Sequence, residues 1–205
     1  MKKMLIMICA ATLCLILSAC RPTVAPEKPV LYLYPQVTTD VTVTLDVDGK
    51  LTCTYPAYQN GWSVTAVPDG TLTDDAGQTY RYLYWEAETY GAYDFSAGFC
   101  VAGKDTAAFL EDTLAQIGLN RTEANEFIVY WLPRMEHNAY NLISFQTDAY
   151  TDSSRLHINP APDSLLRVFM AWKPAAAPVE IVPQSFAPFT RSGFTAVEWG
   201  GAEVS

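Results

Sequence analysis

Two different periods of hydrophobic alternation divide this chain, and they constrain its fold more than any other feature. Apolar and polar residues alternate with the period of a β-strand over most of the sequence before residue 104 and after residue 139. Between them, "DTAAFLEDTLAQIGL" (105–119) has apolar residues at helical spacing, and "NRTEANEF" (120–127) begins with a capping-box pattern. The pattern predicts an α+β fold, mainly an antiparallel β sheet or sandwich, with a short helical pair inserted mid-chain over roughly residues 104–131.

The expected strands are short runs rich in aromatic and β-branched residues, separated by turn residues. They are 30–35, 40–47, 50–56, 61–67, 78–88, 93–101, 140–145, 154–158, 164–172, 179–182 and 194–199. Asp48-Gly49 predicts a hairpin turn between the second and third of them. "FIVYWLP" (127–133) fits either a buried strand or a continuation of the second helix, and Pro133 is expected to end either one.

The N-terminus has the pattern of an export signal. Two lysines precede an uncharged apolar run over residues 4–17, which is too short to cross a membrane as a helix. Leu17-Ser18-Ala19-Cys20 resembles a bacterial lipobox, in which the cysteine is acylated and becomes the mature N-terminus. This resemblance implies a signal peptide over 1–19 and a lipidated Cys20. The prolines that follow predict an extended tether over 20–29, and the remaining length without a further linker predicts one α+β domain over 30–205. The lipobox resemblance also implies an extracytoplasmic protein that is anchored to a membrane by its lipid.

Charge argues against nucleic acid as a partner. Residues 1–19 contain two lysines and no acidic residue, so the rest of the chain carries 11 Lys and Arg against 22 Asp and Glu. Phosphate binding needs clustered cations, which an acidic domain of this kind does not supply. The membrane contact we expect is therefore the lipid on Cys20 and not the surface of the folded domain.

The remaining cysteines and the histidines limit the redox and metal chemistry. Once Cys9 and Cys14 are removed with the signal and Cys20 is lipidated, Cys53 and Cys100 are left, and they form either a disulfide or two separate buried thiols. The chain has two histidines, His137 and His157, and no metal-ligand spacing around them. We therefore expect no metal site and no cofactor.

Charged residues inside apolar segments are the candidates for ion pairs or for catalysis. Arg134, Arg167 and Glu198 are expected to form structural ion pairs, with Glu198 against one of the two arginines, because unpaired buried charges are costly. The alternative is a carboxylate pair that hydrolyses glycosidic bonds, with Glu86, Glu126 and Glu198 as candidate catalytic residues. No nucleophile elbow or phosphate-binding loop is present, and the sequence does not favour an enzyme.

Aromatic residues favour a binding role. Tyr80, Tyr82 and Tyr84 alternate along one expected strand and could form a flat surface for a glycan or protein ligand. The five tryptophans are expected mostly in the core.

Five segments together resemble one family of uncharacterised bacterial secreted proteins and lipoproteins: "KPVLYLYP", "RYLYWE", "NEFIVYWLPRME", "PDSLLRVFMAW" and "GFTAVEWGG". The similarity spans nearly the whole chain after the signal and implies no activity or site. The sequence thus predicts a membrane-anchored extracytoplasmic lipoprotein with a non-catalytic binding or envelope-associated domain. The alternative is a carboxylate-based hydrolase of cell-envelope or extracellular glycans.

Overall fold

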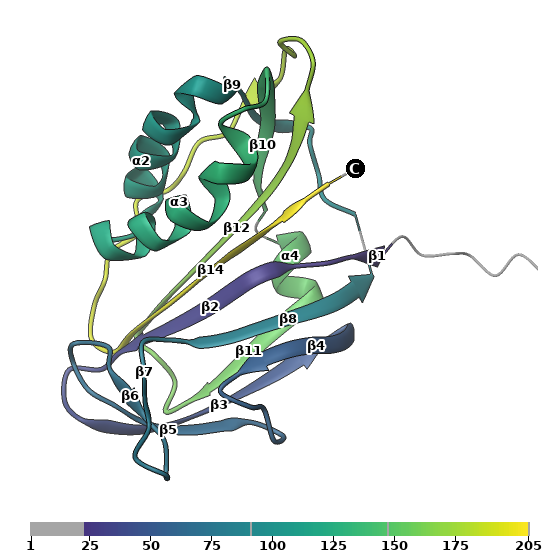
Figure 1. Cartoon of the computed structure of the whole chain (residues 1–205). Coiled ribbons are helices and arrows are strands. Elements are labelled where there is room, and N and C mark those ends of the chain that lie inside the picture. Colours follow the sequence, from purple (N-terminus) through teal and green to yellow (C-terminus); the bar gives the residue numbers. More distant parts are fainter. Residues whose placement is uncertain (1–22, 91, 147, 205) are drawn as a thin grey trace, which may run out of the picture.

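The structure is a computed structural model that describes residues 23–90, 92–146 and 148–204. It contains a large and a small β sheet with a pair of helices on the outer face of the large one, as Figure 1 shows. The fold is therefore α+β, as the alternation of periods predicts. The expected signal peptide and the Cys20 predicted to be lipidated lie outside the described residues. No helix in the described ranges is both long and apolar enough to cross a bilayer.

The large sheet, sheet A, has nine strands. Its order is β1 (Thr23–Val24), β8 (Leu83–Tyr90), β2 (Glu27–Tyr34), β14 (Thr195–Glu203), β12 (Ser164–Ala175), β10 (Tyr140–Gln146), β9 (Ala97–Ala102) and β13 (Val182–Pro183), with β4 (Gly49–Tyr55) also paired to β8. Sheet A is mixed and not purely antiparallel, because β12 and β14 run parallel side by side. A parallel pair needs a long connection, and residues 176–194 provide it.

The small sheet, sheet B, has five strands in the order β11 (Ser154–Asn159), β3 (Thr39–Val47), β5 (Trp62–Ala66), β6 (Leu72–Thr73) and β7 (Thr79–Tyr80). The hairpin expected at Asp48-Gly49 is wrong. β3 pairs with β11 and β5, whereas β4 pairs with β8, so the chain passes from sheet B to sheet A at this turn. This position requires glycine, because the Cβ atom of any other residue at position 49 would lie 1.9 Å from the Glu88 carbonyl oxygen.

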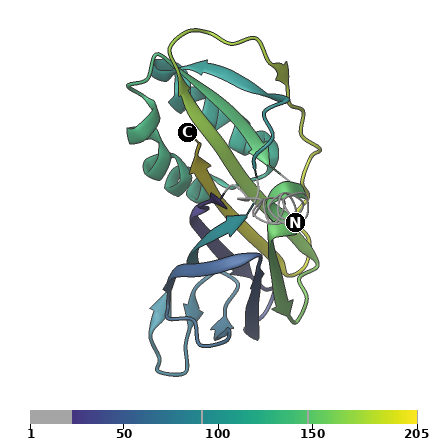
Figure 2. The same cartoon turned by 90° about the vertical axis from the view of Figure 1, so that its right-hand side faces the viewer.

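Sheet A is buried on both faces, and this explains its strand sequences. Alternate residues of β2 point to opposite cores, with Val30 and Tyr32 toward the helices and Leu31 and Leu33 toward sheet B. A strand buried on both faces reads as a nearly continuous apolar run, as "VLYLY" does. Figure 2, the view turned by 90°, shows the helices against one part of sheet A and the small sheet below them.

The helical pair consists of α2 (Thr106–Ile117), preceded by the 3₁₀ turn η2 (Gly103–Asp105), and α3 (Arg121–Met135). The expected capping box at Asn120 and Glu123 is present, and Gly118 ends α2 in the left-handed conformation. "FIVYWLP" continues α3. The helix also runs through Pro133 and does not end there. Proline lacks the N–H that would bond to the Val129 carbonyl, and the helix ends two residues later, at Met135.

A third short helix, α4 (Asp148–Ser153), is not predicted by the sequence, since six mostly polar residues carry no helical period. The expected strand 179–182 shrinks to the two residues of β13. The segment expected to be a tether is partly folded, because Thr23–Val24 and Glu27–Tyr34 are strands of sheet A.

Candidate functional site

Glu198 lies on the face of sheet A that packs toward sheet B. It is fully buried, and its Oε2 accepts hydrogen bonds from Arg167 Nε at 2.7 Å and from the Tyr150 hydroxyl at 2.9 Å. Its Oε1 accepts from Trp85 Nε1 at 3.1 Å. Arg167 is the residue directly opposite Glu198 in the parallel β12–β14 pair, so the ion pair joins neighbouring strands at a fixed register.

The side chains around this pair close it off from solvent. Arg167 also donates to the Ser154 carbonyl oxygen at 2.6 Å, and its guanidinium lies 4.7 Å from the centre of the Tyr150 ring. Burial lowers the pKa of Arg167, but Glu198 and Tyr150 raise it more, and it ends above its usual value. Burial, with Glu198 second, raises the pKa of Tyr150 well above its usual value. A carboxylate held by three donors with no exposed surface acts as a structural anchor.

A second, half-exposed group of side chains lies on the opposite face of sheet A, beside α3. We call it the Lys28 cluster: the rings of Tyr82, Tyr84 and Tyr130 around the Lys28 ammonium group, flanked by the carboxyl groups of Glu27, Glu86 and Glu126. The Lys28 Nζ lies 5.1, 5.3 and 5.7 Å from the three ring centres, and it donates to the Tyr82 hydroxyl at 3.3 Å. These rings and carboxyl groups are only partly buried.

A break in strand pairing places Lys28 there. Val30 pairs with Trp199 of β14 and Glu27 pairs with Gly201, so three steps along β2 match two along β14. The extra residue produces a bulge, and Lys28 within it has φ of 58°. The Lys28 N–H donates to the side chain of Glu86, to its Oε1 at 3.3 Å.

Helix α3 closes the other side of the cluster. Arg134 forms an ion pair with Glu27 and stacks over the Tyr130 ring, with its guanidinium carbon 4.9 Å from the ring centre. The Tyr130 hydroxyl faces Glu27 Oε2 at 3.4 Å. Arg134, one of the two expected partners of Glu198, is thus paired with a carboxylate that the sequence did not single out.

Glu126 is linked to the core beneath the cluster. Its Oε2 accepts from the Tyr32 hydroxyl at 2.5 Å, and that hydroxyl accepts from Trp199 Nε1 at 3.2 Å. Burial, then the Glu126 carboxylate, raises the pKa of Tyr32 far above its usual value. Burial, with Glu86 second, also raises the pKa of Tyr84, so both phenols stay un-ionised near neutral pH.

The candidate residues thus separate into two places. Glu86 and Glu126 share the helix face of sheet A, whereas Glu198 lies on the other face, so the three carboxyl groups do not converge. Tyr82 and Tyr84 lie in the cluster, but Tyr80 belongs to sheet B and donates to Asp74 at 2.8 Å. The row of three tyrosines is therefore interrupted by the change of sheet.

A further buried ion pair was missed by the sequence analysis. Glu123, the capping-box residue of α3, is fully buried and accepts from Arg191 Nη1 at 3.1 Å. Arg191 also donates to the Gly118 carbonyl oxygen at 3.0 Å, which ties the last loop to the turn between the helices. The capping pattern predicted a local role for Glu123 and gave no signal for a partner 68 residues away.

Both cysteines are free in the structure, and the exposed position of Cys53 also differs from the alternative of two buried thiols. Cys53 is exposed on β4 and Cys100 is half-buried on β9. Five strands of sheet A separate β4 from β9, so the two lie roughly 29 Å apart at about 4.8 Å per strand. A disulfide needs Cα atoms within about 7 Å. Among the described residues, no group of three or more His, Cys, Asp or Glu side chains could hold a metal ion.

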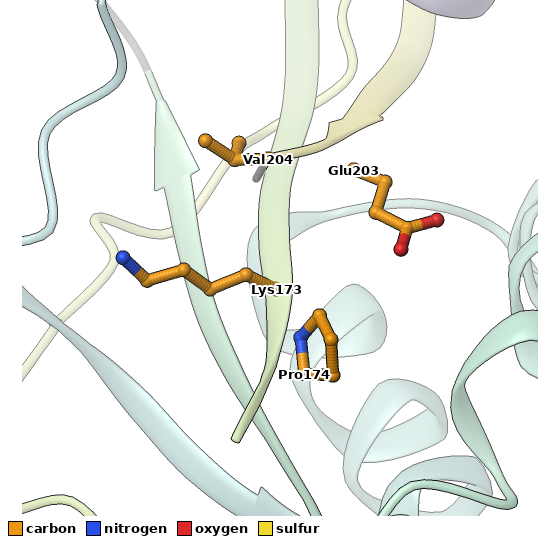
Figure 3. Close-up of a pocket in the computed structure, with 4 residues that line it drawn as sticks. All are labelled: Lys173, Pro174, Glu203 and Val204. Atoms are coloured by element: carbon orange, nitrogen blue, oxygen red, sulfur yellow. The ribbon is translucent and has the colours of Figure 1, made fainter.

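Figure 3 shows a shallow hollow of about 380 Å³ at the ends of β12 and β14, lined by Lys173, Pro174, Glu203 and Val204. The Lys173 amine and the Glu203 carboxylate point away from each other, and the amine lies 5.0 Å from the centre of the Phe95 ring. The hollow therefore lacks converging polar groups, and the Lys28 cluster is the better candidate site.

Comparison with known proteins gives one partial relative. A stretch of 64 residues is 47% identical to a protein of Butyrivibrio fibrisolvens described as "Uncharacterized protein in bglA 3'region". The match covers 30% of this chain and 66% of that protein, so the chain spans just under two thirds of the relative's length. No protein-family model matches the chain. No solved structure matches it either.

Proposed function

We propose that this chain is a lipid-anchored extracytoplasmic binding protein and that the Lys28 cluster is its binding face. The observation that carries the proposal is the meeting of three half-exposed tyrosine rings with three carboxyl groups on one face of sheet A. Tyrosine rings offer flat contact area at low conformational cost, and the carboxyl groups between them can orient a polar ligand. Sequence resemblance to the lipobox supports the anchor on Cys20.

The geometry supports a binding protein better than a glycan hydrolase. Hydrolysis needs two carboxyl groups that both reach one glycosidic bond, one of them held protonated. Glu198 is buried on the far face, Glu126 accepts from Tyr32, and Glu86 accepts from the Lys28 backbone. The three carboxyl groups thus do not converge on one bond, although Glu86 and Glu126 still line the binding face.

Binding is tested with the full-length protein in detergent micelles and insoluble bacterial cell-wall preparations in a co-sedimentation assay. Tyr84→Ala and Tyr130→Ala each remove one ring of the face, and each should weaken binding by about 5- to 30-fold, the range for an aromatic contact worth roughly 1–2 kcal/mol. Tyr90→Ala is the matched control, because Tyr90 is 47% exposed at the far end of β8, six residues from Tyr84 and outside the cluster. If both cluster variants sediment like wild type, the binding face is elsewhere.

The anchor is tested separately. Growth with a labelled fatty acid should mark the wild-type protein and leave Cys20→Ala unlabelled. Label of equal intensity in both would refute the lipid anchor and would leave the binding assay unaffected.

A further inference from the structure

The Lys28 ammonium group occupies an unusual environment for a cation. Three tyrosine rings surround it, and its hydrogen-bond partner among the described residues is a neutral phenol, the Tyr82 hydroxyl. Over the same residues, no carboxylate lies within ion-pair distance of its Nζ. Its attraction to the site therefore comes mainly from the ring faces, whose negative quadrupoles bind cations.

The backbone holds Lys28 in this position at a cost. A φ of 58° is left-handed, and a residue with a Cβ is rarely found there. Glycine would be more comfortable in the bulge, yet the position carries a long cationic side chain that reaches into the rings.

The charge around the rings favours a cation. Glu27, Glu86 and Glu126 place three carboxyl groups against two cationic side chains, Lys28 and Arg134. Arg134 is already paired with Glu27. Without the Lys28 side chain, three aromatic faces and an excess of negative charge would remain, which is the composition of a site for organic cations.

We propose that Tyr82, Tyr84 and Tyr130 form a cage for an organic ammonium group and that Lys28 is its resident, competing occupant. This inference rests on the proposed function, since it names the ligand class of the same face. A ligand that carries an ammonium group enters as the Lys28 side chain swings out toward solvent, so one cation replaces another with little change in charge. The Lys28 side chain is tethered to the site, so its effective concentration there is in the millimolar range. A ligand therefore displaces it only when the ligand makes contacts with the protein beyond those of its ammonium group.

The experiment uses choline as the probe and full-length protein in detergent micelles, with binding followed by NMR of the choline methyl signal. Lys28→Gly removes the competitor and suits the left-handed backbone, and Lys28→Met removes the charge but keeps most of the side chain. Lys28→Arg keeps a cation in place. The uncharged isostere 3,3-dimethyl-1-butanol controls for shape, and ionic strength is held constant with sodium chloride.

We expect Lys28→Gly and Lys28→Met to bind choline at least about tenfold more tightly than wild type and Lys28→Arg, and at least about tenfold more tightly than the uncharged isostere. Tyr84→Ala in the Lys28→Gly background should abolish the gain. The inference is overturned if folded Lys28→Gly binds choline no better than wild type, or binds the isostere equally well.

The two proposals fail separately. If cell-wall binding depends on Tyr84 and Tyr130 but no variant binds choline, the face is a binding site of another ligand class. If choline binds the cage while the tyrosine variants keep their cell-wall binding, the cage stands and the proposed function falls.

Discussion

Replacing Glu198 with glutamine changes one atom of the side chain and removes the negative charge that faces Arg167. The carboxylate accepts hydrogen bonds on both oxygens, two at Oε2 and one at Oε1. A carboxamide offers an acceptor on one side only, so its NH₂ group must point either at the Trp85 N–H or at the Tyr150 and Arg167 donors. The change therefore leaves buried donors unpaired and Arg167 without its counter-charge.

The size of the effect follows from burial. The side chain of Arg167 is 9% exposed and that of Glu198 is 0% exposed. Removing one partner of a buried pair costs about 3–5 kcal/mol. In a domain of this size the melting midpoint falls by about 2–4 °C per kcal/mol, so we expect a loss on the order of 10 °C.

A thermal melt followed by circular dichroism measures this loss in Glu198→Gln against wild type. The matched control is Asp46→Asn, which breaks the ion pair of Asp46 with Arg155, also between neighbouring strands but with side chains 59% and 54% exposed. Such a surface pair contributes less than about 1 kcal/mol, so the control should melt within about 4 °C of wild type. If Glu198→Gln melts no lower than the control, the structural role of Glu198 is wrong, and a ligand-binding or catalytic role must be sought for it.

Two further results are expected from the same structure. Stability should fall above pH 10, because Tyr32 and Tyr150 have pKa values raised above their usual 10 and remain protonated in the folded state. The unfolded state then binds fewer protons than the folded state, so each tyrosine removes about 1.4 kcal/mol per pH unit. Urea unfolding at pH 8 and pH 11 measures the loss; Tyr32→Phe should reduce it, and equal stability at both pH values would contradict the reasoning. Maleimide labelling of the native protein should modify exposed Cys53 faster than half-buried Cys100, whose Sγ accepts the Val179 N–H at 3.2 Å. Recovery of a peptide with Cys53 and Cys100 joined by a disulfide would show that the sheet order is wrong.

Local sequence pattern predicted most elements of this fold, because strand and helix periods are properties of adjacent residues. α2 and the start of α3 lie where the helical spacing and the capping box placed them. Strand partners were not predictable in the same way. Asp48-Gly49 has the residues of a hairpin turn, but β4 pairs with β8 because Gly49 allows close backbone contact with Glu88. That contact depends on a segment about 40 residues away in the sequence.

The same difference between local pattern and tertiary contact applies to the Glu198 ion pair and to the Lys28 cluster. The cost of burying charge was sufficient to expect Glu198 beside an arginine, because "FTAVEW" and "SLLRVFMAW" each carry one charge in an apolar run. Tyr150 could not be expected there, since it stands alone in a polar segment, and its burial over Phe169 and Arg167 comes from the tertiary fold.

The Lys28 cluster shows why a row of tyrosines in sequence need not be a surface in space. The period-two alternation predicted Tyr80, Tyr82 and Tyr84 on one face of a single strand. In the structure Tyr80 belongs to sheet B, and the third ring around Lys28 is that of Tyr130 from α3. The cation comes from a bulge in β2 that no local pattern marks, because the positive φ of this lysine depends on the pairing of β2 to β14 and on the hydrogen bond to Glu86. A cage assembled from three separate segments can hold a cation only when the bulge keeps its register.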